Sequence, residues 1–156
     1  MEGKSEQVFL TAVVSRFYAD KPELQIISAS GDIDQAERSI NAIEQIFKPL
    51  ERTLYGDRAI ILLDKPGKQA TLDNFIEHHK ALQKNGQLFV LHTNSLEEYY
   101  PAREDWRRTP EHVADMDGGQ KSRLAKRVGT GITQEEFEKG MVVMFDALNA
   151  CWKFAY

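Results

Sequence analysis

Four acidic residues stand where secondary structure could bring carboxylates together: Glu2, Glu6, Asp64 and Glu97. Glu2 and Glu6 precede or open the first expected helix, so Glu6 faces the same side as the turn that holds Glu2. Asp64 ends an apolar run, and Glu97 follows the next apolar run along the chain. Because these segments would emerge at one edge of a sheet, their carboxylates repel one another unless a cation neutralises them. Oxygen ligands suit Mg²⁺ or Mn²⁺, so the sequence predicts a divalent metal site.

The element that would position Asp64 is the apolar run at residues 59–64. Turn residues flank this run on both sides, which predicts a short strand buried on both faces, as in parallel sheets covered by helices. In open α/β sheets, ligands bind at the carboxyl ends of the strands. The alternative interpretation of Asp64 is a helix cap or a turn residue.

The remaining chain alternates helices with strands. Apolar spacing predicts helices over residues 5–18, 36–50, 70–83, 120–128 and 133–154, and strands over residues 24–29, 59–64 and 87–92. Helix-sized connections between strands predict right-handed crossovers and a parallel sheet. Gly86 is expected to end the third of these helices, and residues 101–118 form a polar excursion.

Composition limits the class of protein. The 156 residues fit one domain, and 42% hydrophobic and 28% charged residues are typical of a soluble globular chain. No signal peptide is visible, and no run approaches the ~20 apolar residues of a membrane span, so no membrane partner is expected. The single cysteine, Cys151, fits a reducing compartment such as the cytoplasm and is expected to be a small buried residue. No histidine spacing indicates zinc.

Basic residues are concentrated in the second half of the chain. The net charge of −4 argues against a basic coat but permits a basic strip beside an acidic metal site. Residues 121–127 hold four positive charges, and Arg103, Arg107 and Arg108 precede them. Such a run is either a solvated helix face or a strip that contacts phosphates. Trp106, among the arginines, could stack on a base or pack at the rim.

The order of these motifs resembles the Toprim domain of topoisomerases, primases and a group of nucleases. The resemblance rests on the motif Glu2-Gly-Lys-Ser-Glu6, on the helix–strand–helix order that follows it, and on a buried strand that ends in Asp64. The later features are similar to the nuclease domain of the overcoming-lysogenization-defect (OLD) family: Leu96-Glu-Glu-Tyr-Tyr-Pro101 after the sheet, and Lys121 leading a helix, with Lys126 as the second match. The resemblance covers nearly the whole chain.

This resemblance implies an α/β, Toprim-like (Rossmann-like) fold with a mostly parallel sheet flanked by helices. Residues 1–100 would form the catalytic core, and residues 101–156 a helical extension that completes the same domain. The implied activity is that of a metal-dependent DNA endonuclease or nickase, which hydrolyses phosphodiester bonds with two Mg²⁺ or Mn²⁺ ions. A role in phage defence follows from the resemblance alone.

The resemblance also implies a role for each site residue. Glu2 would be a metal ligand or general base, Glu6 and Asp64 metal ligands, and Glu97 the distal acid that completes the site. Lys121 would stabilise charge that develops on the phosphate. The expected nucleic-acid contacts are Arg107, Arg108, Arg123, Lys126 and Arg127.

Two departures from the family pattern affect these expectations. The family's D-x-D motif is Asp64-Lys-Pro66 here, so one metal should be held weakly and Mn²⁺ should be preferred. The strand that normally runs into the first glutamate is missing, and in the family this domain follows an ATPase region. We therefore expect a fragment or short relative, an ATPase domain or subunit as partner, and possible homo-oligomers.

Other interpretations remain open at this stage. The chain could be a non-catalytic Toprim remnant that binds nucleic acid or a partner ATPase. Glu2 and Glu6 could simply be favourable acids near a helix N-terminus, and Glu97-Glu98 a solvated turn. Glu98, Tyr99 and Tyr100 are expected to be capping and packing residues.

Overall fold

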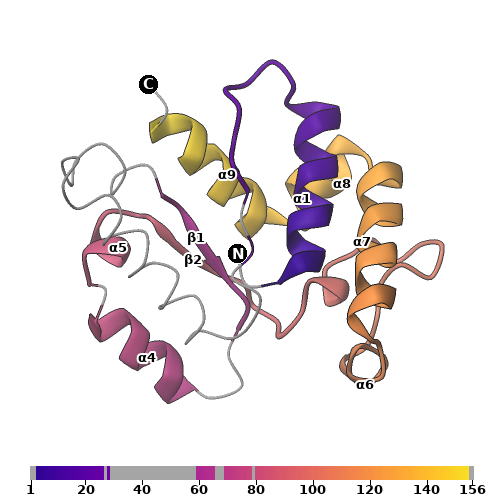
Figure 1. The fold of residues 1–156 in the computed structure, drawn as a ribbon, viewed down its shortest axis with the longest axis horizontal. Coiled ribbons are helices and arrows are strands. Elements are labelled where there is room, and N and C mark those ends of the chain that lie inside the picture. The colour runs from indigo at the N-terminus through magenta and orange to yellow at the C-terminus, as the bar shows by residue number, and fades with distance from the viewer. Residues whose placement is uncertain (1–2, 27, 29–58, 66–68, 79, 155–156) are drawn as a thin grey trace.

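The computed structural model describes residues 3–26, 28, 59–65, 69–78 and 80–154. Within these ranges, helices surround a parallel sheet of two strands, β1 (Ile61–Leu63) and β2 (Leu88–Val90) (Figure 1). The α/β class and the parallel pairing predicted from the sequence are confirmed. The larger Toprim-like sheet stays a prediction, and the expected helix at residues 36–50 lies outside the described residues.

The helices agree with the apolar spacing in most places. They are α1 (Lys4–Phe17), α4 (Gln69–His78), α5 (Lys80–Lys84), the 3₁₀ turn η2 (Leu96–Glu98), α6 (Pro110–Ala114), α7 (Gly118–Gly131), α8 (Gln134–Gly140) and α9 (Val142–Phe154). None of the helices in the described part of the chain combines the length and apolar character that crossing a bilayer requires.

Three predicted elements need correction. The single helix expected over residues 133–154 is divided at Met141, because Gly140 ends α8 and Met141 leaves helical geometry to enter the core. Leu24 to Ile26 are not in a strand, and the Ile26 carbonyl accepts a hydrogen bond from the Gln7 side chain at 2.8 Å; residues 27 and 29 of the predicted strand lie outside the described residues. The excursion after residue 101 contains α6, which Thr109 caps and a proline at the first helical position favours.

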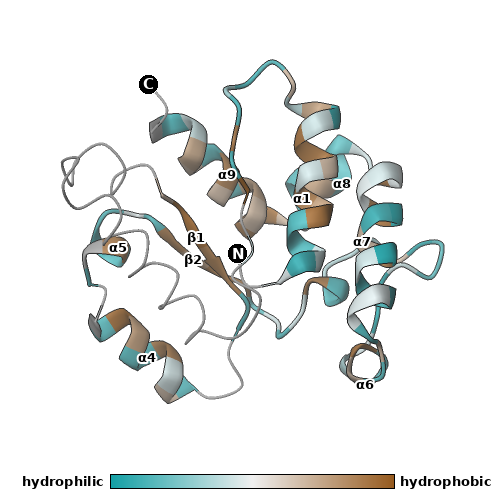
Figure 2. Cartoon of the chain, in the orientation of Figure 1, coloured by the Kyte–Doolittle hydropathy of each residue, from teal (hydrophilic) through white to brown (hydrophobic). Residues whose placement is uncertain are grey.

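The sheet is covered on both faces, as its apolar strands predict. Alternate side chains of a strand point to opposite faces. Ile61 and Leu63 pack with Leu72 and Phe75 of α4, whereas Leu62 joins the larger core that α1, α7, α8 and α9 share. Figure 2 shows the hydrophobic colouring of both strands between these two layers.

The connection from α5 into β2 is a Schellman motif. Gly86 has a φ of 69°, which only glycine adopts at little cost. Its N–H donates to the Gln83 carbonyl at 3.1 Å, and the Gln87 N–H donates to the Leu82 carbonyl at 2.8 Å. The predicted helix end at Gly86 is confirmed, and it aligns β2 with β1.

Helices α1 and α7 pack closely and run in the same direction (Figure 1). A Cβ atom on Gly129 would lie 2.8 Å from the Ala12 Cβ, so this crossing requires glycine. Nη1 of Arg16 donates to the carbonyls of Gly129 at 2.7 Å and Ile132 at 2.9 Å. These bonds join the two C-terminal ends, and the two N-terminal ends therefore also lie together.

Candidate active site

Glu6 and Glu97 are the two predicted site acids that the structure buries together. Glu6 lies in the first turn of α1 with a relative exposure of 5%, and Glu97 lies in η2 with 1%. The charge of Glu6 contributes to raising the pKa of Glu97, so the two carboxylates interact electrostatically. The alternative of a solvated turn at Glu97 is therefore wrong.

Several contacts hold η2 against α1. The rings of Tyr100 and Phe9 lie 5.4 Å apart between centroids. Nε of Arg107 donates to the Tyr100 carbonyl at 2.7 Å, and the Arg108 N–H donates to the Glu97 carbonyl at 3.0 Å. Glu97 is thus held by the segment that follows it in the sequence and, through Tyr100, against α1.

The environment of Glu97 favours its neutral form. Burial raises the pKa of Glu97 above its ordinary value, and the charges of Glu6 and Glu98 add to this effect. Its own backbone hydrogen bond and the charge of Lys121 oppose the shift. Lys121 is half-buried near the start of α7, whereas Lys126 is exposed. Of the two candidate lysines, Lys121 is the one whose charge acts on Glu97.

Two buried oxygen atoms in this cluster have no hydrogen-bond partner among the described residues: Oε1 of Glu97 and the hydroxyl of Tyr100. Burial, followed by the charges of Glu97 and Glu6, raises the pKa of Tyr100 well above its ordinary value. Buried polar atoms without partners cost free energy and are uncommon in native structures. The cluster therefore fits a ligand that supplies the missing contact, such as a cation at the carboxylate oxygen.

Gly3 gives the Glu6 carboxylate its place over the start of α1. A Cβ atom on Gly3 would lie 2.1 Å from Oε2 of Glu6. The Ser5 hydroxyl donates to this same oxygen at 3.3 Å. The glycine between Glu2 and Glu6 thus has a steric role that spacing alone did not reveal.

The structure describes one of the other two predicted metal ligands. Glu2 lies outside the described residues, and Asp64 is half-buried just after β1. Among the residues that the structure describes, no three His, Cys, Asp or Glu side chains form a group that could hold a metal. Mg²⁺, however, is commonly bound by one or two carboxylates, with waters and substrate phosphates completing its shell. The Glu6–Glu97 pair, with its unpartnered oxygen, fits an ion held in that way.

The three residues after Glu97 make capping and packing contacts. Glu98 accepts a hydrogen bond from the Ser95 hydroxyl at 2.9 Å, and the Tyr99 hydroxyl accepts from the backbone N–H groups of His92 and Thr93. Tyr100 is fully buried in the core. These contacts agree with the interpretation of Glu98, Tyr99 and Tyr100 as capping and packing residues.

Trp106 and Cys151 are also packing residues. Trp106 is 2% exposed, and the Arg103 guanidinium lies 4.2 Å from its ring centroid, so its ring has no free face for a base. Cys151 is half-buried, and burial raises the pKa of its thiol to about 11, which makes the thiolate scarce at neutral pH.

The predicted nucleic-acid contacts divide into two groups. Arg108, Arg123 and Arg127 line one pocket of about 430 Å³, together with Met116, Gln120 and Leu124. Arg107 instead supports η2, as described above, and Lys126 is exposed on α7 outside the pocket. Sequence reasoning missed Met116 and Gln120, since neither stands in a charged pattern.

Comparisons with models of protein families, with curated proteins and with solved structures find no match. The functional interpretation therefore depends on the motifs of this chain and on the geometry of its buried acids.

Proposed function

We propose that this protein is a metal-dependent phosphodiesterase that cleaves DNA as an endonuclease or nickase. The observation that carries the proposal is the buried carboxylate of Glu97. One of its oxygens has no hydrogen-bond partner among the described residues, and the charges of Glu6 and Lys121, from two other elements, both act on it. Two acids and a lysine within electrostatic reach of one another provide sites for a cation and for a phosphate oxygen.

In this proposal, each residue has a specific task. Glu6 and Glu97 hold Mg²⁺ or Mn²⁺, with Asp64 and Glu2 as the further acids that the resemblance implies. When bound, the ion lowers the pKa of a coordinated water and stabilises the leaving oxygen. Lys121 orients the phosphate and offsets charge that develops on its oxygens. The surrounding core excludes water, which strengthens these interactions.

A plasmid assay tests this proposal. Supercoiled DNA incubated with the protein and Mn²⁺ should yield nicked circles, and EDTA should stop the reaction. Lys121→Ala should lower the rate by ~10²-fold or more, the scale of a lost electrostatic group. Lys126→Ala removes the same charge from an exposed position of the same helix and should have a much smaller effect. No cleavage by folded protein with Mg²⁺ or Mn²⁺ would refute the proposal.

The second candidate is a non-catalytic domain that binds nucleic acid. It is favoured by the absence of a three-ligand metal group among the described residues and by the proximity of Lys121 to Glu97, because a protein cation can itself compensate the acids. Calorimetric titration with Mn²⁺ separates the two candidates. The nuclease should bind the ion, and Glu97→Gln should weaken that binding, whereas the non-catalytic domain should bind none.

A further inference from the structure

The pocket lined by Arg108, Arg123 and Arg127 lies beside the candidate active site. We call it the arginine pocket; its other lining residues are Met116, Gln120 and Leu124. A second hollow of about 310 Å³, lined by Arg108, His112 and Met116, adjoins it through the two residues that both share. The two hollows form a groove along α7 and α6.

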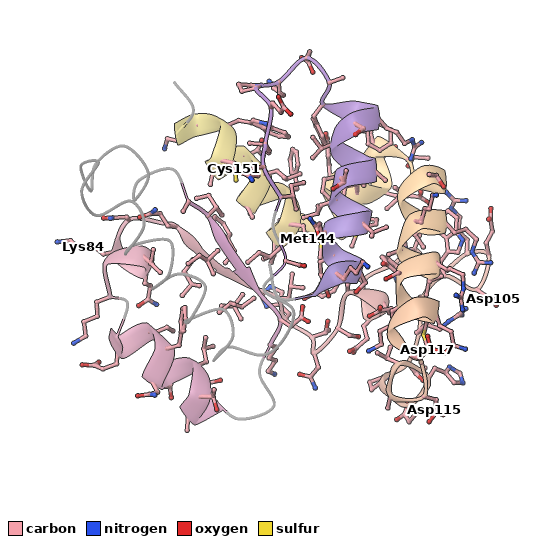
Figure 3. The ribbon with its side chains drawn as sticks, in the orientation of Figure 1. Lys84, Asp105, Asp115, Asp117, Met144 and Cys151 are labelled. Carbon is pink, nitrogen blue, oxygen red and sulfur yellow. The ribbon has the colours of Figure 1, made fainter. Side chains whose placement is uncertain are left out.

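The pocket's guanidinium groups are not paired with acids in the described part of the chain. Among the described residues, none of its three guanidinium groups forms an ion pair or a hydrogen bond with a side chain. Asp115 and Asp117 stand near the junction of α6 and α7 (Figure 3). Asp117, however, accepts the Gln120 N–H at 2.8 Å as the cap of α7. Uncompensated guanidinium groups in a concave site attract an anion and suit a phosphate.

The floor of the pocket is apolar. Leu124 is 4% exposed and Met116 packs against the main core. An apolar floor beneath guanidinium planes can accept the face of a nucleobase, because bases stack on apolar and cationic planar groups. The pocket therefore offers contacts for both parts of a nucleotide, its base and its phosphate.

Its position relative to Lys121 also suits a nucleic-acid strand. Gln120, Arg123 and Arg127 recur at the spacing of one helix face, adjacent to the face that carries Lys121. Arg127 follows Lys121 by six positions, about 9 Å along the axis of α7 at 1.5 Å per residue. A strand with one phosphate at Lys121 would therefore bring a nearby nucleotide to the arginine pocket.

We propose that the arginine pocket binds one unstacked nucleotide of a single-stranded segment next to the phosphate held at Lys121. The inference rests on the proposed function, since it takes nucleic acid as the substrate. A base within a duplex is paired and stacked, and bringing it into a pocket requires breaking those contacts. The protein should therefore prefer single strands or junctions to intact duplex.

Fluorescence anisotropy in EDTA tests the proposal without catalysis. A labelled single-stranded oligonucleotide should bind at least ~10-fold more tightly than the same sequence in a blunt duplex, the scale of one stacked base. Met116→Ala should remove most of this preference by weakening binding of the single strand alone. Arg127→Ala should reduce the dependence of log Kd on log salt by about one phosphate contact.

Lys126→Ala is the matched control, because it removes one charge from α7 outside the pocket. It should weaken both forms of DNA slightly and equally. Equal affinity for the two forms, or equal effects of Arg127→Ala and Lys126→Ala, would overturn the proposal. Tight competition by free dTMP would also overturn it, in favour of a site for a free nucleotide.

The plasmid assay keeps this inference separate from the proposed function. A preference for single strands without nicking in Mn²⁺ would support the arginine pocket and defeat the proposed catalysis. Nicking without any preference for single strands would support the proposed catalysis and defeat the role of the arginine pocket.

Discussion

Phe9 and Tyr100 place their rings 5.4 Å apart, tilted by 47°, where η2 meets α1. Phe9 follows Glu6 by one turn of α1, and Tyr100 follows Glu97 by three residues. Aromatic pairs at this separation contribute packing beyond their buried area. The contact therefore holds the two acids together, although neither ring carries a catalytic group.

The Tyr100 hydroxyl can be separated from its ring by mutation. Tyr100→Phe removes a buried hydroxyl that has no partner among the described residues, so we expect the free energy of unfolding to stay the same or rise by about 1 kcal/mol. Tyr100→Ala removes the ring and should cost about 3–5 kcal/mol. Urea unfolding measures both. A marked loss of stability in Tyr100→Phe would show that the hydroxyl has a partner.

Gly3→Ala tests the placement of the Glu6 carboxylate. The new Cβ would lie 2.1 Å from Oε2 of Glu6 and push that carboxylate aside, while the extended backbone of Gly3 accepts alanine without strain. We expect plasmid nicking to fall by ~10²-fold, as for a misplaced catalytic group, with little change in melting temperature. Gly118→Ala is the control, because its Cβ meets open space. Equal activities of the two variants would argue against this role of Gly3.

The buried carboxylate of Glu97 should reduce the stability of the fold at neutral pH, as is common for groups that serve a function. Since burial raises its pKa, the folded state favours the protonated acid. The stability that the protonated carboxyl contributes is present at low pH and is lost as the pH rises through the folded-state pKa. Glu97→Gln should therefore melt at a higher temperature than the wild type at pH 7 in EDTA, while nicking falls by ~10²-fold or more. Glu98→Gln, which alters the neighbouring acid, should lose little activity. A lower melting temperature for Glu97→Gln would contradict the expectation.

Glu136 should make stability sensitive to acid. Two hydrogen bonds from Arg103, at 2.8 and 2.9 Å, hold the pKa of Glu136 at about 2. A lowered pKa contributes stability that is present above about pH 4.5 and is lost as the pH falls towards 2. Glu136→Gln keeps a side chain suited to the capping box of α8 but has no charge.

Thermal unfolding at stepped pH measures this effect. The wild type should lose stability more steeply between pH values of about 4.5 and about 2 than Glu136→Gln does. Glu135→Gln is the control, because its pair with Lys139 is largely exposed and contributes little. Parallel curves for the wild type and Glu136→Gln would show that the Arg103 contact does not stabilise the fold.

Local sequence signals were sufficient to predict most of the helices and strands in the described part of the chain. The apolar periods of α1 and α7 depend on residues three or four apart, and Gly86 ends its helix through bonds within six residues. The predicted secondary structure was wrong where contacts between residues far apart in the sequence stand in place of the expected element. Ile26 bonds to the Gln7 side chain, and Met141 enters the core where the last helix was expected to continue.

For the site, the sequence alone determined which residue types stand at strand ends and helix starts, because these depend on local pattern. The tertiary structure decided which of them meet. In the structure Glu97 is buried within electrostatic reach of Glu6, and the charge of Lys121, not that of Lys126, acts on Glu97. Three arginines line one pocket with Leu124 and Met116. Burial and charge proximity are properties of packed elements, and the close parallel packing of α1 and α7 brings together the N-terminal ends that carry Glu6 and Lys121.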